Sequence, residues 1–128
     1  MDGAEIYKHL KDGDIIGEEG QKIYYKISKK YENTNTFPDT DKSLGKAIDV
    51  YFESIGSTTT EYLVNFGYFE NIAKTFGLQL LSSNTFKEDM DELNKSKQTW
   101  GKAKNLDKFK SLLEFSLYNR KFVFQKIT

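Results

Sequence analysis

The chain has 128 residues, with 19 basic and 19 acidic side chains, one histidine and no cysteine. This length favours one domain, and the absence of cysteine excludes disulfides, thiolate metal sites and a cysteine nucleophile. A single histidine excludes a multi-histidine zinc site, and a formal net charge of zero argues against a generally basic nucleic-acid-binding protein.

The sequence carries no sign of a membrane segment or a secretion signal. No stretch reaches the roughly eighteen apolar residues that a membrane-spanning helix needs. Residues 1–14 include several acidic side chains and lack an apolar centre, which is unlike a signal peptide. We therefore expect a soluble intracellular protein. Its aromatic content of 15% predicts a packed core rather than disorder throughout the chain.

The first predicted element is a short helix over residues 2–10. Asp2 is a suitable N-cap, and Glu5 follows three residues later, which is the spacing of a capping box. Residues 13–20 contain three glycines and several acidic side chains, so they predict a turn-rich connection.

Two strands are predicted next, over residues 21–31 and 46–54, because apolar and polar side chains alternate in both. The polar segment between them holds the only proline and predicts an exposed loop. We expect an antiparallel pair with this loop at its tip. The apolar sides of the two strands are Ile23, Tyr25 and Ile27, and Ile48, Val50 and Phe52.

The second half alternates helices with short strands. An amphipathic helix over residues 65–77 ends at Gly77, and a strand follows at residues 78–81. Further helices are predicted from residue 86 and over residues 106–119, with a last strand over residues 121–127. The apolar positions on which these helices depend are Phe69, Ile72, Ala73 and Phe76, then Phe86, Met90 and Leu93, and finally Leu106, Phe109, Leu113 and Leu117.

This order of elements indicates a mixed α/β chain with few strands. A doubly wound domain built from these parts lacks its first, nucleotide-binding half. The chain contains no glycine-rich dinucleotide loop, no phosphate-binding loop and no nucleophile elbow. We therefore expect it to form part of a larger sheet.

Several polar residues allow a functional interpretation but favour a plainer one. His9 ends a short helix, where the helix dipole explains a basic residue. Trp100 can stack on a ligand, although packing against the domain is the more common role of such a residue. Two carboxylate pairs and a group of lysines are typical of solvated surfaces, although the lysines could contact phosphate: Glu18 and Glu19, Asp89 and Glu92, and Lys95, Lys97, Lys102 and Lys104.

Glu61 is the most informative polar residue, because it stands between a threonine-rich loop and the apolar run Tyr62 to Val64. A partly desolvated carboxylate is costly unless it meets hydrogen-bond donors. Guanine offers two donors on one edge, N1–H and the N2 amino group, and a carboxylate can accept both. The alternative is that Glu61 caps the turn that follows it.

A set of segments in a fixed order resembles a known family. The segments are GAEIYKHL, GQKIYYKISKKY, GKAIDVYFESIG, TEYLVNFGYFENIAKTFGLQLLSSNTFKE and SLYNRKFVFQK. Together they resemble the C-terminal part of mRNA cap guanine-N7 methyltransferases. The greatest similarity is to the methyltransferase domain of the multifunctional mRNA capping enzymes of large DNA viruses.

The resemblance implies an α/β fold that supplies the C-terminal portion of a seven-stranded Rossmann-like sheet, with an inserted antiparallel hairpin. It also implies that Glu61 contacts the guanine edge of the cap and that Tyr118 lines the cap pocket. The alternative for Tyr118 is a core aromatic at a helix end. Methyl transfer to N7 needs no general base, so the resemblance implies no catalytic residue and no metal in this chain.

The same resemblance implies that residues 1–128 form one partial methyltransferase domain. The family binds S-adenosylmethionine through an upstream half, so this chain alone is not expected to be active. The implied partners are the 5′ cap of mRNA together with the missing half, another capping-enzyme chain or a second copy. The implied location is the host cytoplasm or the virion.

Two other interpretations remain open. The chain could be a non-catalytic interaction module or regulatory subunit, derived from a methyltransferase, that binds a capping-enzyme partner. It could also be an unrelated small α+β scaffold whose aromatic residues form only a core. The methyltransferase-derived interpretations both predict an exposed strand edge and an apolar face.

Overall fold

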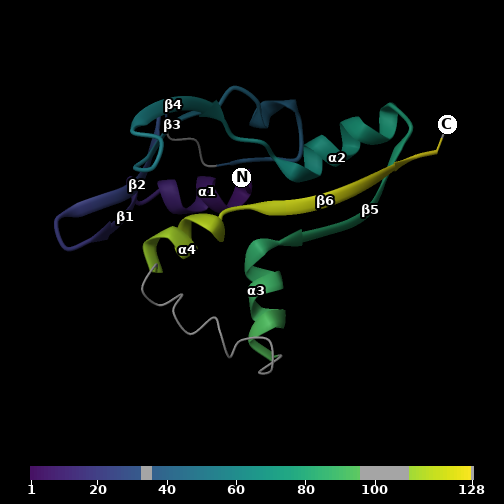
Figure 1. Cartoon of the computed structure of the whole chain (residues 1–128). Coiled ribbons are helices and arrows are strands. Elements are labelled where there is room, and N and C mark those ends of the chain that lie inside the picture. Colours follow the sequence, from purple (N-terminus) through teal and green to yellow (C-terminus); the bar gives the residue numbers. More distant parts are fainter. Residues whose placement is uncertain (33–35, 96–109, 128) are drawn as a thin grey trace.

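A computed structural model of the chain describes residues 1–32, 36–95 and 110–127 (Figure 1). Within these ranges, six strands form one sheet of four strands and a separate sheet of two. The strands are β1 (Ile15–Glu19), β2 (Lys22–Lys29), β3 (Ala47–Phe52), β4 (Ser57–Tyr62), β5 (Leu78–Thr85) and β6 (Arg120–Lys126). The helices are α1 (Gly3–Leu10), η1 (Asp41–Ser43), α2 (Phe66–Thr75), α3 (Phe86–Lys95) and α4 (Lys110–Ser116).

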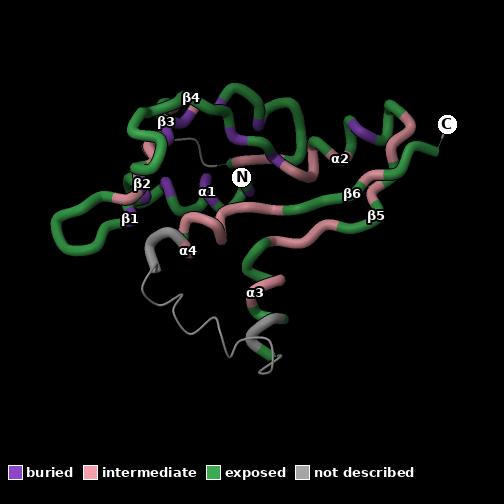
Figure 2. The backbone as a smooth tube through the Cα atoms, in the orientation of Figure 1, coloured by how far each residue is buried: buried purple, intermediate pink, exposed green. Residues whose placement is uncertain are grey.

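The buried core lies between α1 and the four-stranded sheet, whose strands follow the order β1-β2-β3-β4. Figure 2 shows the buried residues gathered there, while β5 and β6 carry only intermediate and exposed positions. The helix contributes Ile6 and Leu10, which are fully buried. The facing strand residues are Tyr25, Ile27, Ile48 and Val50.

The predicted start of α1 is confirmed. The Asp2 carboxylate accepts a hydrogen bond from the Glu5 N–H at 3.4 Å, which satisfies one of the free donors of the first helical turn. The predicted antiparallel pair is also confirmed, since β2 and β3 pair with Ile27 opposite Val50.

The prediction of a turn-rich connection over residues 13–20 is confirmed only at its ends, where Gly13 and Gly20 have positive φ, and was wrong between them, because Ile15–Glu19 forms strand β1 and pairs with β2. Gly17 lies opposite Tyr25, and a Cβ atom at position 17 would overlap the Tyr25 ring. The glycine that suggested a turn therefore makes room for a core aromatic across the strand pair.

The threonine-rich segment was also interpreted wrongly, since Ser57–Tyr62 forms the edge strand β4 rather than a loop. All six of its residues are exposed. No apolar alternation marks such a strand, and its pairing with β3 stabilises it instead.

The elements of the second half are confirmed where the structure describes them. α2 ends before Gly77, whose φ of 75° is the left-handed conformation that terminates helices. β5 runs four residues beyond its predicted end, to Thr85. Residues 106–109 of the predicted helix 106–119 lie outside the described ranges, and α4 covers Lys110–Ser116.

The apolar face of α2 is more exposed than a core helix requires. Only Ala73 is buried, whereas Phe69, Ile72 and Phe76 are 38%, 39% and 73% exposed. The helix therefore forms as its pattern predicts, but the described part of the chain covers little of that face.

Arg120, the only arginine in the sequence, connects the two-stranded sheet to α1 and α2. Its Nε and Nη2 donate to the Asp2 carboxylate at 3.2 and 3.1 Å, and its Nη1 donates to Ser83 Oγ at 2.7 Å. The guanidinium also lies 5.1 Å from the centre of the Phe66 ring. One side chain thereby joins α1, β5, β6 and α2.

The mixed α/β composition is confirmed, and all described strand pairs are antiparallel. These pairings do not confirm a Rossmann-like methyltransferase sheet. In the described ranges, no helix has the length and apolar character needed to cross a bilayer.

Tyr25 gives the fold a pH dependence on the alkaline side. Burial, followed by the neighbouring Tyr118 and Glu114, raises the pKa of Tyr25 from its ordinary value of 10.0 to about 12. The unfolded chain therefore loses this proton first. The contribution of the protonated Tyr25 hydroxyl to the free energy of unfolding is fully present below about pH 10. It is lost as pH rises toward about 12, which lowers the free energy of unfolding by roughly 2 kcal/mol.

This prediction can be checked by urea denaturation of the wild type and Tyr25→Phe between about pH 8 and pH 12. The difference in unfolding free energy between the two proteins should be constant below about pH 10 and should shift against the wild type above it. Parallel curves over the whole range would contradict the raised pKa.

Candidate functional site

Glu61 lies on the edge strand β4, directly opposite Ile48 of β3. Directly opposed residues of an antiparallel pair project from the same face of the sheet, so Glu61 shares the face on which Ile48 is buried. Glu61 itself is exposed. Among the described residues, no side chain donates a hydrogen bond to its carboxylate, which leaves both oxygens available to a ligand.

Glu61 does not cap the helix that follows it, because that role belongs to Asn65. The Asn65 Oδ1 accepts from the Tyr68 N–H at 2.9 Å, while its Nδ2 donates to the carbonyl oxygens of Phe37 and Pro38 at 3.1 and 2.9 Å. Asn65 is 5% exposed, so these bonds hold the end of the polar loop against the start of α2. Asn65 rather than Glu61 therefore caps α2.

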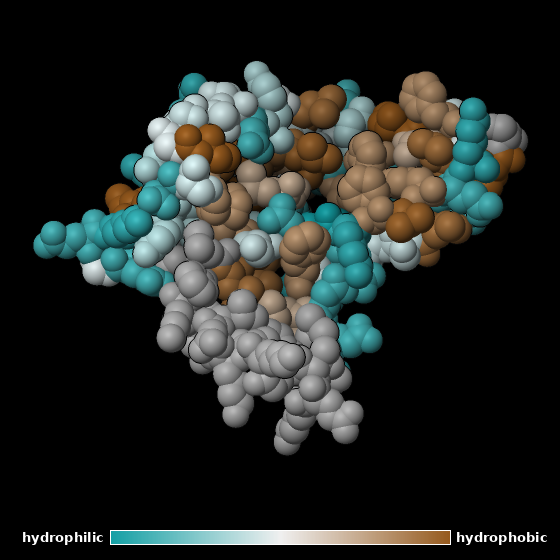
Figure 3. All heavy atoms as spheres, viewed as in Figure 1, coloured by the Kyte–Doolittle hydropathy of each residue, from teal (hydrophilic) through white to brown (hydrophobic). Residues whose placement is uncertain are grey.

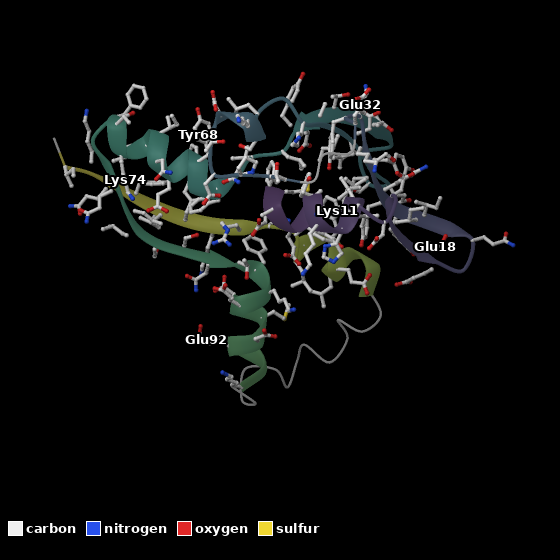
Figure 4. All side chains as sticks on the ribbon, turned by 180° about the vertical axis from the view of Figure 1, so that it is seen from behind. Lys11, Glu18, Glu32, Tyr68, Lys74 and Glu92 are labelled. Carbon is white, nitrogen blue, oxygen red and sulfur yellow. The ribbon has the colours of Figure 1, made fainter. Side chains whose placement is uncertain are left out.

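A largely apolar cavity of about 470 Å³ begins one residue beyond Glu61. Tyr62, Leu63 and Val64 line one side of it, and residues of α2 line another. Figure 4 labels Tyr68, one of the α2 residues, beside the loop that carries η1. Glu61 therefore directly precedes, in the sequence, the residues that form one wall of this cavity.

Tyr118 lies in a different setting, between the end of α4 and the start of β6. Its half-buried ring meets the His9 ring edge-on, with 5.5 Å between ring centres. Burial, then the charges of Glu114 and Glu5, raise the pKa of the Tyr118 hydroxyl. Tyr118 is therefore protonated at neutral pH and is a potential hydrogen-bond donor.

The cavity beside Tyr118 has a volume of about 520 Å³ and an acidic lining. His9 and Lys87 are its basic members, and its carboxylates are Asp2, Glu5, Glu88, Asp91 and Glu114. This distribution of charge disfavours phosphate and favours a neutral or cationic ring.

The two residues expected to bind guanine are not brought into one described cavity. Tyr118 lines the acidic cavity, whereas Glu61 lines neither that cavity nor the three largely apolar ones described. Glu61 is exposed and Tyr118 is half-buried, so both side chains are accessible to a ligand. That the two residues bind one guanine together stays a prediction.

The other polar candidates have ordinary surroundings where the structure describes them. His9 Nδ1 donates to the Glu5 carbonyl at 2.8 Å, and Asp89 pairs with Lys121 at 3.0 Å. Glu18, Glu19, Glu92 and Lys95 are exposed. The remaining candidates lie outside the described residues: Lys97, Trp100, Lys102 and Lys104. In the part of the chain that is described, no group of three or more His, Asp or Glu side chains could hold a metal ion.

An aromatic surface on α2 and β6 was not singled out from the sequence as a site. Phe66 and Phe69 meet Phe122 and Phe124 with ring centres 5.4 to 5.7 Å apart. Beside them lies a cavity of about 240 Å³ that Val64 and Phe122 help to line. Figure 3 shows hydrophobic residues over the end of the molecule that carries α2. The alternation of phenylalanines in residues 122–124 was the available signal.

Comparison with protein families and with curated proteins found no relative of this chain. No protein-family model matches the chain, and no curated protein matches it at a significant level.

Proposed function

We propose that this chain is the cap-guanine-binding C-terminal portion of an mRNA (guanine-N7-)methyltransferase. In that role it contributes to methyl transfer from S-adenosylmethionine to N7 of the RNA 5′ cap. The observation that carries the proposal is Glu61: an exposed carboxylate, without a donor among the described residues, one position before the residues that line an apolar cavity.

The chemistry of guanine fits such a carboxylate. The N1–H and the N2 amino group donate side by side, so one carboxylate can accept both in a bidentate arrangement. N7 lies on the other ring of the base, carries a lone pair and has no proton to remove. Attack by N7 makes the base cationic, and the charge of Glu61 stabilises that developing positive charge.

Tyr118 is proposed to line the same pocket. Its acidic surroundings favour the cationic methylated base over the triphosphate bridge of the cap. The phosphates therefore extend away from the Tyr118 cavity, and the ring and hydroxyl of Tyr118 contact the base or its ribose.

The methyl donor is proposed to bind outside this chain. The sequence has no glycine-rich loop between a strand and a helix, so its residues do not fit a site for S-adenosylmethionine. Within a complete enzyme, β5 and β6 would form the last part of a Rossmann-like sheet whose first half holds the donor. Among the described residues, β5 and β6 pair only with each other, so an outer edge of their sheet can accept a further strand.

A second candidate function is a non-catalytic interaction module derived from a methyltransferase. The exposed apolar face of α2 favours it, because a surface of this kind marks a protein contact. Under this alternative, partner binding would not depend on Glu61.

The test is a titration of the isolated, isotope-labelled chain with unmethylated cap dinucleotide, followed by NMR, with S-adenosylmethionine titrated in parallel. We expect shifts that cluster around Glu61 and Tyr118 with the cap and no shifts with the donor. Silence with the cap up to about 1 mM would contradict guanine binding by this chain. Shifts with S-adenosylmethionine would contradict the proposal that the methyl donor binds outside this chain.

A further inference from the structure

His9 lies in the last turn of α1 and lines the same cavity as Tyr118. The two rings meet edge-on, with 5.5 Å between their centres. A base that contacts Tyr118 from within this cavity therefore comes close to the imidazole ring of His9. His9 is also the only histidine of the chain.

The helix fixes the proton on one ring nitrogen of His9. Nδ1 lies 2.8 Å from the carbonyl oxygen of Glu5, and a carbonyl oxygen only accepts, so Nδ1 carries the proton. In the neutral ring, Nε2 therefore keeps its lone pair. Among the described residues, none donates a hydrogen bond to Nε2, and the His9 side chain is 45% exposed. Nε2 can therefore take up a proton from water without breaking a contact.

Histidine is the residue type in this cavity whose charge ordinarily depends on pH near neutrality. Histidine side chains ordinarily change charge between about pH 5 and pH 8, whereas carboxylates, lysine and tyrosine ordinarily keep theirs. The Glu5 carboxylate lies 3.8 Å from Nδ1 of His9, and the Asp2 carboxylate is paired with Arg120 at 3.1 Å. The charged groups that line the cavity with His9 come from α1 and its N-cap, from α3 and from α4: Asp2, Glu5, Lys87, Glu88, Asp91 and Glu114.

The charge of the base is what methylation changes. Guanine is neutral before N7 attacks the methyl group and cationic afterwards, so the two forms of the cap differ by one positive charge at the base. Like charges repel appreciably within the screening length of about 8 to 10 Å at ordinary salt concentrations. A positive charge on His9 therefore acts mainly on the methylated form.

We propose that His9 determines which form of the cap this pocket holds: the neutral ring admits the N7-methylated base, and the protonated ring disfavours it. The unmethylated base is affected much less. Acidification then releases the product of methyl transfer rather than the substrate. By linkage, a bound methylated base opposes the protonation of His9 to the same extent. This inference rests on the proposed function, because it takes the cavity of Tyr118 to be part of the cap pocket.

The test compares the wild type with His9→Gln, by NMR titration with the methylated and the unmethylated cap dinucleotide between about pH 5 and about pH 8. The methylated base can itself lose a proton in this range, so the quantity compared is the affinity of the wild type relative to that of the variant. For the methylated cap, this relative affinity should fall at least about threefold from pH 8 to pH 5. For the unmethylated cap it should stay nearly constant.

Lys87→Gln is the matched control, because it removes a positive charge from the lining of the same cavity. A lysine ordinarily stays charged over the whole range, so this change should raise the affinity for the methylated cap by a similar factor at every pH. The unmethylated cap reports on folding, since a partly unfolded protein loses affinity for both forms equally.

The possible results separate this inference from the proposed function. If the methylated cap binds with the same pH dependence in the wild type and in His9→Gln, His9 does not select the form of the cap. An equal loss of affinity for both forms at low pH also overturns the inference. If neither form binds up to about 1 mM, the proposed function is wrong and this inference fails with it.

Discussion

Replacing Arg120 with methionine is expected to lower the free energy of unfolding by about 3 kcal/mol, the lower end of the cost of breaking a buried ion pair. The Asp2 carboxylate is only 10% exposed, and it would lose both guanidinium donors while keeping one backbone donor at the start of α1. Ser83 Oγ would lose its donor as well. Urea denaturation of the two proteins measures the difference.

The matched control is Lys74→Met. Lys74 pairs with Glu70 at 3.3 Å, but its side chain is 59% exposed, so the same type of replacement should cost less than about 1 kcal/mol. Asp2→Asn combined with Arg120→Met would complete a double-mutant cycle and should show coupling between the two sites. If Arg120→Met costs no more than Lys74→Met, the ion pair between Arg120 and Asp2 does not stabilise the packing of the two-stranded sheet against α1.

Glu61→Gln is expected to weaken binding of the cap dinucleotide by about 10- to 100-fold, because the amide offers a donor where guanine also offers one. The loss of negative charge also removes support for the cationic base, so methyl transfer in a reconstituted enzyme should fall. The unfolding free energy should change by less than about 0.5 kcal/mol, since Glu61 is exposed.

Glu53→Gln is the control for this change, because it removes the same charge from an exposed carboxylate that pairs with Lys22 instead. Its affinity for the cap should match that of the wild type. Activity of Glu61→Gln or Glu61→Ala within a factor of about two of the wild type would contradict the role of Glu61. Equal losses in the Glu53 and Glu61 variants would indicate a general charge effect.

The predictions that succeeded rest on local chemistry. Asp2 caps α1 because its side chain reaches a donor three residues away, and Gly77 ends α2 because it adopts a positive φ. The alternation in β2 and β3 identified the buried positions Tyr25 and Ile48 for the same reason. In each case the sequence signal and the structural cause lie within a few residues of each other.

The predictions that failed depend on distant partners. β1 and β4 owe their extended form to hydrogen bonds with β2 and β3, and neither strand has a regular apolar pattern of its own. Gly17 was interpreted as a turn residue because the ring that needs its space, that of Tyr25, lies across the strand pair. The longer course of β5 likewise reflects its pairing with β6.

The candidate site divides in the same way. The chemical character of Glu61, a carboxylate at a junction of polar and apolar residues, could be stated from the sequence. Its exposure on an edge strand and the assignment of the helix cap to Asn65 could not. The acidic cavity beside Tyr118 is formed by residues of α1, α3 and α4, so the sequence of any one segment does not predict it.

The sequence by itself determined the local elements of this protein: where α1 begins, where α2 ends, and which faces of β2 and β3 are apolar. Tertiary structure alone decided the rest. It placed β1 and β4 in a sheet, brought Arg120 to Asp2 across 118 positions, and left much of the α2 face exposed within the described part of the chain. Strand pairing, ion pairing and burial depend on residues far apart in the chain, and no local pattern records them.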